Sequence, residues 1–432
     1  MTTKQLSFVD LFAGCGGLSL GLEQSGFNPV FVNELNRDAL STYQFNRREQ
    51  FPYLSDNRFF AQDIKDIVSS DPERLERLKS DLLEYHNLDV FKADSDLDLL
   101  VGGPPCQGYS GIGHRRSYSV DKTQLPSNHL YQDMAFMINQ LKPRVFLFEN
   151  VRGLLNSRWT KTGHKGEIWQ DVKQTFEDLP NYSIRSQLVL AKDYGVPQNR
   201  PRVLLVGIRD DLGFEFKDND SNYIAGGLIP HPRDYSINPP HLEDLLSDLV
   251  DPNYKNGGKT STYPVDPMNE IQSKLRMNQL GNPTYQGDPL TEQEYSNHSE
   301  KVVKKFQHMI ENDGEIPQQY ITKKFSQKVL RPRWNENGPN ITITSLADDY
   351  VHWAQPRSLT VRECARMQTF PDWYEFLGKR TTGGLRRAGN PRESLHYREV
   401  PKYTQIGNAV PVLLAKIIGL HFKDILTKCG HI

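Results

Sequence analysis

The chain of 432 residues has little cysteine and lacks any long apolar run. Its four cysteines lie far apart and form no CxxC pair, which argues against a disulfide framework and against a structural zinc site. No apolar run approaches the roughly 18 residues of a membrane helix, and the N-terminus does not resemble a signal peptide. We therefore expect a cytoplasmic protein with no metal site and no membrane-spanning segment.

An excess of charge of either sign is also missing, since 52 Lys and Arg residues stand against 53 Asp and Glu residues. The net charge of −1 excludes a uniformly basic coat, so a nucleic acid would have to be bound by local basic segments. Hydrophobic residues make up 37% of the chain, as is typical of folded globular proteins. The length predicts two to three domains of about 150 residues each.

Short apolar runs are present in the first half of the chain, separated by segments of helical composition. Runs without alternation are typical of strands that are buried on both faces of a parallel sheet. We predict an α/β fold with a doubly wound, mostly parallel, Rossmann-like sheet. The expected strands lie at residues 7–12, 30–32, 99–101, 145–148 and 203–208.

The pattern changes near residue 211, where a polar and proline-rich stretch begins and continues to about residue 340. We interpret this stretch as part of a second, smaller and irregular domain. Residues 403–420 have the apolar stripe of a packed helix, which we expect to return to the first domain. The predicted boundaries are 1–212 with 400–432 for the first domain, and 213–399 for the second domain and its hinge.

A glycine-rich turn follows the first predicted strand, in SFVDLFAGCGGLSLGLEQSG. Gly14, Gly16 and Gly17 allow a tight turn and close approach of a ligand, and the next helix offers its N-terminal amides. Glu34 ends the second apolar run, where a carboxylate can accept hydrogen bonds from ribose hydroxyls. The pattern predicts either a nucleoside site or a plain turn with a solvated Glu34. Ser19 replaces the third glycine of GxGxxG, which disfavours a dinucleotide.

Three further segments place reactive or charged groups beside predicted strands. Cys106 follows a predicted strand within LLVGGPPCQGYS. It is either a nucleophile at the sheet edge or a buried structural cysteine. Glu149 ends the apolar run of VFLFENV, either as a surface residue or as an acid at the same edge. Gln198, Arg200 and Arg202 alternate in QNRPR and could share one face of a strand, or form a solvated edge.

These segments belong to six blocks whose order and spacing resemble the DNA (cytosine-5) methyltransferases of bacterial restriction-modification systems. The blocks are VDLFAGCGGLSLG, GGPPCQGYS, ENVRGLL, QNRPR, RECARMQTFPDW and YTQIGNAVP. The resemblance covers most of residues 1–210 and 356–420, whereas the polar middle matches the family only weakly, as its variable target-recognition region would. It implies that the protein flips a cytosine out of duplex DNA and methylates C5 within a short recognition sequence.

The resemblance also assigns catalytic roles. The Cys106 thiolate would add to C6 of the cytosine, which makes C5 nucleophilic. Glu149 would hydrogen-bond N3 and the exocyclic amine of the base. Arg202 would contact O2 and orient Glu149, with Arg200 beside it.

The implied methyl donor is S-adenosylmethionine, with S-adenosylhomocysteine as product and no metal. Glu34 would hold the ribose, Phe12 would face the adenine, and Asp63 would bind the adenine amine. Leu35 stands where some family members have Trp, so the adenine would lose an aromatic wall. The expected cofactor residues are Phe12, Gly14, Gly16, Glu34, Asp63, Ile64, Pro104, Leu130, Asn408 and Val410.

DNA contacts are expected from two basic segments, 301–333 and 379–402, each with a net charge of +5 from its Lys, Arg, Asp and Glu residues. The first would read bases in the major groove through Arg331, Arg333 or neighbouring polar side chains. The second would contact phosphates, with a solvated surface loop as the alternative. The resemblance also implies a loop between Ser110 and Tyr131 that closes over the flipped base, in which Arg115 and Arg116 either touch phosphates or are solvated. The expected DNA-binding residues are Ser110, Arg115, Arg116, Arg331, Arg333, Arg386 and Arg387.

Three other functions compete with this interpretation. An RNA substrate is disfavoured by the long middle domain and by PPCQGYS, because the tRNA-methylating branch of the family more closely resembles PPCQPFT. A dehydrogenase is disfavoured by the missing third glycine, and a regulator without catalysis by the presence of both Cys106 and Glu149. The expected partners are double-stranded DNA and, genetically, a cognate restriction endonuclease; we expect a monomer.

Overall fold

The computed structural model describes two compact units of the chain. The first unit comprises Met1–Leu190, Pro201–Ile237 and Leu414–Ile432, and the second comprises Ala191–Arg200 and Asn238–Leu413. Within these units, the described residues are 5–69, 71–105, 126–216, 227, 229–230, 232, 238–321, 327–337, 341–344, 349–382 and 399–431.

The sequence-based boundaries differ from these units at three short segments. Residues 191–200 and 400–413 lie in the second unit, and residues 213–237 lie in the first. A physical reason is visible in the first of these segments, because the Asn199 amide donates a backbone hydrogen bond to the Ile341 carbonyl at 2.9 Å. The comparison of the polar middle of the chain with a target-recognition region stays a prediction.

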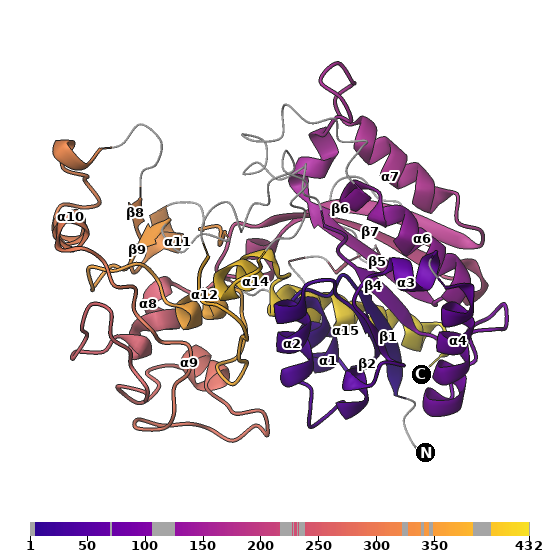
Figure 1. The fold of residues 1–432 in the computed structure, drawn as a ribbon, viewed down its shortest axis with the longest axis horizontal. Coiled ribbons are helices and arrows are strands. Elements are labelled where there is room, and N and C mark those ends of the chain that lie inside the picture. The colour runs from indigo at the N-terminus through magenta and orange to yellow at the C-terminus, as the bar shows by residue number, and fades with distance from the viewer. Residues whose placement is uncertain are drawn as a thin grey trace. The chain divides into compact units, whose positions relative to one another are not determined.

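Seven strands form one sheet in the first unit, in the order β3-β2-β1-β4-β5-β7-β6 (Figure 1). The first five in this order are parallel, and β7 is antiparallel to both β5 and β6. This confirms the predicted mostly parallel α/β sheet. The strands are β1 (Leu6–Leu11), β2 (Phe27–Asn33), β3 (Phe60–Ala61), β4 (Leu99–Gly102), β5 (Val145–Val151), β6 (Tyr182–Leu190) and β7 (Pro201–Arg209).

Helices pack on this sheet through a shared apolar core. Val9 and Leu11 of β1 belong to one core cluster with Met134 of α6 and Val172 of α7. Helices α1 and α15 also pack closely, because a Cβ on Gly419 would clash with the hydroxyl oxygen of Ser25, the residue that follows α1. The helices of this unit are α1 (Gly17–Gln24), α2 (Arg37–Phe45), α3 (Lys65–Val68), α4 (Pro72–His86), α6 (Leu130–Leu141), α7 (Glu167–Glu177) and α15 (Val412–Lys428).

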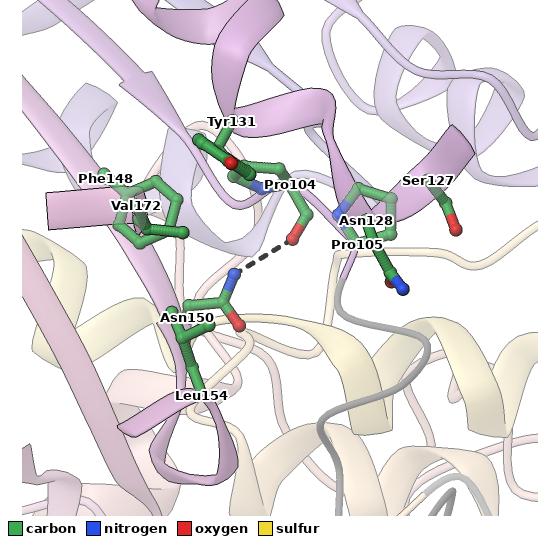
Figure 2. A pocket seen from close by; sticks show the side chains of 9 residues that line it. All are labelled: Pro104, Pro105, Ser127, Asn128, Tyr131, Phe148, Asn150, Leu154 and Val172. Atoms are coloured by element: carbon green, nitrogen blue, oxygen red, sulfur yellow. Dashed lines mark hydrogen bonds between the residues drawn. The ribbon is translucent and has the colours of Figure 1, made fainter. Parts of the chain in front are cut away.

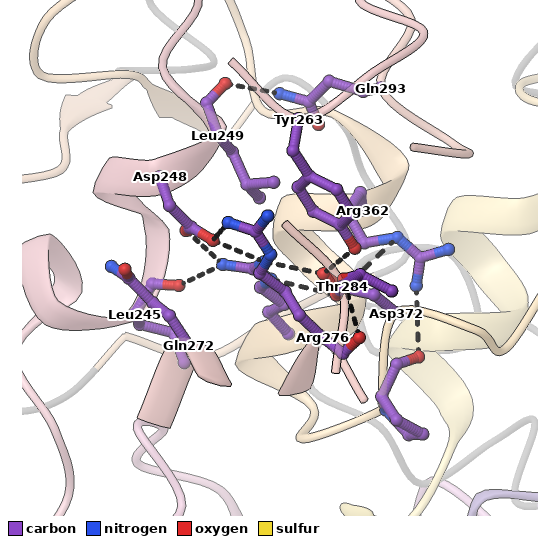
Figure 3. A network of polar contacts seen from close by, with 12 residues as sticks. Leu245, Asp248, Leu249, Tyr263, Gln272, Arg276, Thr284, Gln293, Arg362 and Asp372 are labelled. Carbon is purple, nitrogen blue, oxygen red and sulfur yellow. Dashed lines mark hydrogen bonds and ion pairs between the residues drawn. The ribbon is translucent and has the colours of Figure 1, made fainter. Parts of the chain in front are cut away.

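The second unit is mostly irregular and is held by buried ion pairs. The Arg366 guanidinium donates to Asp248 at 3.0 Å and to Asp372 at 2.6 Å, and all three side chains are buried. Tyr263 donates its hydroxyl to Asp372 at 2.8 Å, and its ring lies under the Arg276 guanidinium (Figure 3). Removing one member would leave another charge buried without compensation, which costs about 3–5 kcal/mol.

Helix α12 contains Arg366 and begins at a capping box formed by Thr360 and Glu363. Cys364 of the same helix is buried, as expected for core packing. The elements of this unit are α8 (Leu242–Leu246), α9 (Glu270–Leu275), α10 (Glu300–Glu311), β8 (Lys328–Val329), α11 (Trp334–Asn337), β9 (Tyr350–Val351), α12 (Val361–Met367) and α14 (Lys402–Asn408). Among the described helices of the chain, none is both long and apolar enough to cross a membrane.

Candidate active site

The chain makes a tight turn between β1 and α1, at the carboxyl edge of the parallel strands. Phe12, Gly14 and Gly16 all have positive φ angles, of 59°, 58° and 86°. Glycine adopts this conformation easily, whereas Phe12 is strained there by about 1–2 kcal/mol. A Cβ added to Gly14 would meet no atom within 4 Å, so the turn has open space beside its backbone.

Glu34 follows β2 and directs its carboxylate toward this turn. Its Oε2 accepts a hydrogen bond from the Gly14 amide and its Oε1 accepts one from the Asn36 amide, each at 2.8 Å. Burial raises the pKa of Glu34 above its ordinary value, and the two amides oppose that shift. Each carboxylate oxygen retains a second acceptor position, which a ribose hydroxyl could occupy.

The residues that follow β3 lie at the same edge of the sheet, because β2 and β3 are parallel neighbours. Asn33 ties the two strand ends together by donating its side-chain amide to the Ala61 and Gln62 carbonyls, at 3.1 and 2.9 Å. Next in the chain, the exposed Asp63 accepts a hydrogen bond from the Lys65 amide, and Ile64 is buried in the core. This arrangement presents the Asp63 carboxylate to solvent at the edge where Glu34 also lies.

Glu149 of β5 and Arg202 of β7 form an ion pair. Arg202 stands directly opposite Val151 in the antiparallel ladder, so it is the diagonal neighbour of Glu149 on the same face of the sheet. Both side chains are nearly buried, with 9% and 7% of each residue exposed. A Cβ on Gly103 would lie 3.0 Å from Glu149 Oε2, so glycine leaves room for the carboxylate there.

Asn150 is a further site residue, which the sequence analysis did not predict. Its side-chain amide donates to the Pro104 carbonyl at 3.1 Å, which holds the backbone just before Cys106 (Figure 2). Its position directly after Glu149 in a strand is the signal that could have identified it. Asn150 also lines a small pocket at this point, together with Pro104, Pro105, Ser127, Asn128, Tyr131, Phe148, Leu154 and Val172.

Several expected residues lie outside the described part of the chain. They are Cys106, Ser110, Arg115, Arg116, Arg386 and Arg387. Pro104 and Leu130 lie on either side of the first of these undescribed stretches, and Leu130 begins α6 and packs against the core. In the described residues, no group of three or more His, Cys, Asp or Glu side chains could hold a metal ion.

Arg200 contacts backbone carbonyls of the second unit, whereas Arg202 lies in the first unit and pairs with Glu149. The Arg200 guanidinium donates to the Gly407 carbonyl at 2.7 Å and to the Ile343 carbonyl at 3.1 Å. Gln198 and Arg200 precede β7, which begins at Pro201. The alternate residues of QNRPR therefore do not share one face of a strand. In the second unit, Asn408 is exposed at the end of α14 and Val410 is buried.

The two described arginines that were expected to contact DNA are exposed and paired with acids. Arg331 lies 2.9 Å from Asp313, and Arg333 pairs with Glu336 and, at 3.3 Å, with Glu243. Exposed ion pairs of this kind contribute little to stability, so a polyanion could replace the acidic partners at small cost.

The fold and this site together define a class of enzyme. A mostly parallel sheet, with a glycine turn and a buried acidic side chain at its carboxyl edge, is typical of nucleoside-cofactor enzymes. The missing third glycine and the buried Glu149–Arg202 pair beside the strand that precedes Cys106 fit a methyltransferase rather than a dehydrogenase.

The family model described as C-5 cytosine-specific DNA methylase matches residues 6–424, and the chain belongs to this family of DNA (cytosine-5) methyltransferases. The Type II methyltransferase M.DdeI of Desulfomicrobium norvegicum is 29% identical over 427 residues, which cover 96% of this chain and 87% of the relative. M.Bpa9945I of Bacillus paralicheniformis is 28% identical over 482 residues, which cover 98% and 99% of the two chains. The resemblance found in the six sequence blocks is thereby confirmed.

A solved structure supports the fold. A chain from E. coli, described as a DNA modification methyltransferase encoded within a prophage, superimposes with a TM-score of 0.64 at 22% identity, and the match covers 98% of this chain and 99% of that one.

Proposed function

We propose that this enzyme flips a target cytosine out of duplex DNA and methylates its C5 through covalent addition of Cys106 to C6. The observation that most supports this proposal is the buried Glu149–Arg202 pair beside Gly103, three residues before Cys106. One oxygen of Glu149 pairs with Arg202 and the other lies over Gly103, so the carboxyl group has a fixed orientation. A fixed acid at this edge can hold a proton on the base while the thiolate attacks.

The steps of the reaction balance without a metal or a redox partner. The Cys106 sulfur forms a bond to C6, the electron pair of the C5–C6 double bond shifts to C5, and Glu149 stabilises the ring at N3. S-adenosylmethionine, when bound, would supply the methyl group to C5 and leave as S-adenosylhomocysteine. A base then removes the C5 proton, the sulfur–C6 bond breaks, and the double bond and the free thiolate are restored.

The residues at the turn fit S-adenosylmethionine. Gly14 has open space where a side chain would stand, and Glu34 presents two fixed carboxylate oxygens beside it. Asp63 is exposed and free of any ion pair among the described residues. We assign binding of the cofactor to Phe12, Gly14, Gly16, Glu34, Asp63, Ile64, Pro104, Leu130, Asn408 and Val410.

Arg202 and Arg200 take different roles in this proposal. Arg202 touches Glu149 and would orient it and contact O2 of the base. Arg200 donates to two backbone carbonyls, so we assign it the positioning of the segment before β7.

The biological setting follows from the relatives, whose names include "Type II methyltransferase". We propose that the enzyme acts as a monomer in the cytoplasm and protects a short DNA sequence from a cognate restriction endonuclease. Its contacts with DNA would come from Ser110, Arg115, Arg116, Arg331, Arg333, Arg386 and Arg387.

The first test is incubation of the protein and S-adenosylmethionine with unmethylated genomic DNA, followed by base-by-base detection of methylated cytosine. Methylation at one recurring short sequence is the expected result. Methylation of tRNA but not of DNA in a parallel reaction would move the substrate to RNA.

A second test addresses the covalent step. Fluorine cannot leave C5 as a cation, so a duplex with 5-fluorocytosine in the recognised sequence should trap the protein covalently. Cys106→Ala should bind the same duplex without forming the adduct and should not transfer methyl groups. Wild-type transfer by Cys106→Ala would refute the assignment of the nucleophile.

A further inference from the structure

A buried polar cluster lies beneath the glycine turn, and the proposed mechanism does not use it. It consists of Asp10 from β1, Ser19 and Glu23 from α1, Tyr43 from α2 and Arg47 just after α2, and we call it the turn cluster. The Ser19 hydroxyl donates to the Asp10 carboxylate and lies 2.9 Å from the Tyr43 hydroxyl. The cluster therefore connects the last residues of β1 to both helices beside the turn.

Arg47 of the turn cluster contacts α1, α2 and the turn itself, and its side chain is only 2% exposed. Its Nη2 donates to the Gly16 carbonyl at 3.2 Å, its Nε to Glu23 Oε1 at 2.6 Å and its Nη1 to the Tyr43 carbonyl at 3.0 Å. The guanidinium also lies 3.8 Å from the centre of the Tyr43 ring. A guanidinium has the fork geometry that these three acceptors require, and an ammonium group does not.

The contact with Gly16 links Arg47 to the turn itself. The Gly16 carbonyl also accepts the first hydrogen bond of α1, from the Leu20 amide at 2.9 Å. Because a peptide unit is planar, fixing this carbonyl fixes the whole peptide between Gly16 and Gly17. Arg47 thus holds the end of a turn whose other end contains the strained Phe12 and the open Gly14.

We propose that Arg47 is a positioning residue for S-adenosylmethionine, which keeps the turn from Phe12 to Gly16 in the conformation that receives the cofactor. The inference rests on the proposed cofactor site. A strained backbone persists only where its surroundings hold it, and a turn that is ordered before binding loses less entropy when the ligand arrives. Loss of Arg47 therefore weakens cofactor binding without touching the cofactor, the cytosine or the DNA.

The test compares Arg47→Met, Arg47→Lys and Arg48→Met with the wild type. Arg48 is the matched control, since it is the next residue, is half exposed and pairs with Glu49. Calorimetry measures the Kd of S-adenosylmethionine without DNA, and steady-state kinetics measure kcat and the KM of genomic DNA. Loss of the contact that holds the turn should raise the Kd of S-adenosylmethionine in Arg47→Met about tenfold, which corresponds to about 1.4 kcal/mol.

The kinetic constants separate positioning from general damage. At saturating cofactor, Arg47→Met should retain the kcat and the DNA KM of the wild type, and Arg48→Met should match the wild type throughout. Arg47→Lys, which keeps the charge but not the fork, should have an intermediate Kd.

Wild-type cofactor affinity in Arg47→Met, or equal losses of cofactor and DNA affinity, would overturn the proposal. If Arg47→Met does not fold, Arg47→Lys decides the question, and wild-type cofactor affinity in that variant overturns the proposal. Failure of the wild-type protein itself to bind S-adenosylmethionine would instead contradict the proposed function.

Discussion

The Glu149 carboxylate pairs with Arg202, the diagonal neighbour of Glu149 across the antiparallel β5–β7 ladder. The two parallel strands β4 and β5 bring Gly103 beside the same carboxylate, so three separate segments of the chain meet there. Because both charged groups are nearly buried, each depends on the other for compensation. This dependence makes the pair a sensitive target for substitution.

Glu149→Gln should slow methyl transfer by about 10²- to 10⁴-fold, the usual contribution of a positioned acid or base. The amide has the shape of the carboxyl group, but it cannot hold a proton on N3 of the base. Single-turnover transfer to DNA at saturating cofactor measures this effect. The Kd of S-adenosylmethionine should not change, and a wild-type transfer rate would rule out the proposed role.

Arg202→Lys should also slow transfer, because a lysine keeps the charge but cannot orient the carboxylate with a fork of donors. Arg185→Lys is the matched control, since Arg185 lies on the exposed part of the neighbouring strand β6. Equal rates in the two variants would contradict an orienting role for Arg202.

Glu34→Gln should weaken S-adenosylmethionine binding about tenfold or more, because charge-assisted hydrogen bonds to ribose are lost and one side-chain NH₂ must face a backbone amide. Calorimetry without DNA measures the change. Glu49→Gln, at an exposed carboxylate, serves as the control. A larger loss of DNA affinity than of cofactor affinity would contradict the assignment of Glu34 to the cofactor site.

The sequence predicts the central part of the sheet well and its edges poorly. Five apolar runs coincide with β1, β2, β4, β5 and β7, which lie within the sheet and are buried on both faces. The edge strands escape this pattern, because β3 has two residues and most residues of the strand β6 are only partly buried. The apolar runs therefore indicate strands that are buried on both faces of the sheet.

The candidate site also contains one feature that the sequence predicts and one that it does not. The spacing between Gly14 and Glu34 predicts that both face one ligand, and the structure joins them by a hydrogen bond. In contrast, nothing local distinguishes the buried Arg47 from the exposed Arg48, because two partners of Arg47, the Glu23 carboxylate and the Gly16 carbonyl, are distant in the sequence. Long-range contacts of this kind require the folded chain.

Leu35→Trp should tighten S-adenosylmethionine binding. Leu35 follows Glu34 directly and is 68% exposed, so a larger side chain has room there. An indole stacked on adenine should lower the Kd about three- to tenfold, as expected for an aromatic contact of about 0.5–1.5 kcal/mol. Leu280→Trp, at an exposed position of the second unit, is the control. An unchanged or higher Kd in Leu35→Trp would contradict the expected place of the adenine.

Asp10→Asn should change the pH dependence of stability. Burial raises the pKa of Asp10 from 3.8 to about 7, a rise that Glu23 and Glu34 assist and that Ser19 and Arg47 oppose. Between these values the folded protein holds a proton that the unfolded chain releases, so stability falls as the pH rises from about 4 to about 7. The asparagine variant lacks this loss. Relative to the wild type, it should gain at least about 1 kcal/mol between pH 5 and pH 8.

Urea unfolding at several pH values measures this difference. Asp56→Asn is the control, because Arg58 lowers the pKa of Asp56 and keeps it ionised throughout this range. Its stability relative to the wild type should stay constant from pH 5 to pH 8, and the same result for Asp10→Asn would contradict the prediction.

The basic segment 379–402 should contribute to the salt dependence of DNA binding. Arg386 and Arg387 lie outside the described residues, and the prediction depends on the local charge of +5. If both contact phosphates, replacing both with Gln should reduce the slope of log K against log salt by about two. Arg331→Gln or Arg333→Gln should instead reduce discrimination between DNA sequences if these residues read bases. A control variant, Lys428→Gln, removes a charge from the exposed Lys428–Asp424 pair. The control should keep the wild-type slope. If the variant that lacks Arg386 and Arg387 also keeps the wild-type slope, these two residues do not neutralise phosphates.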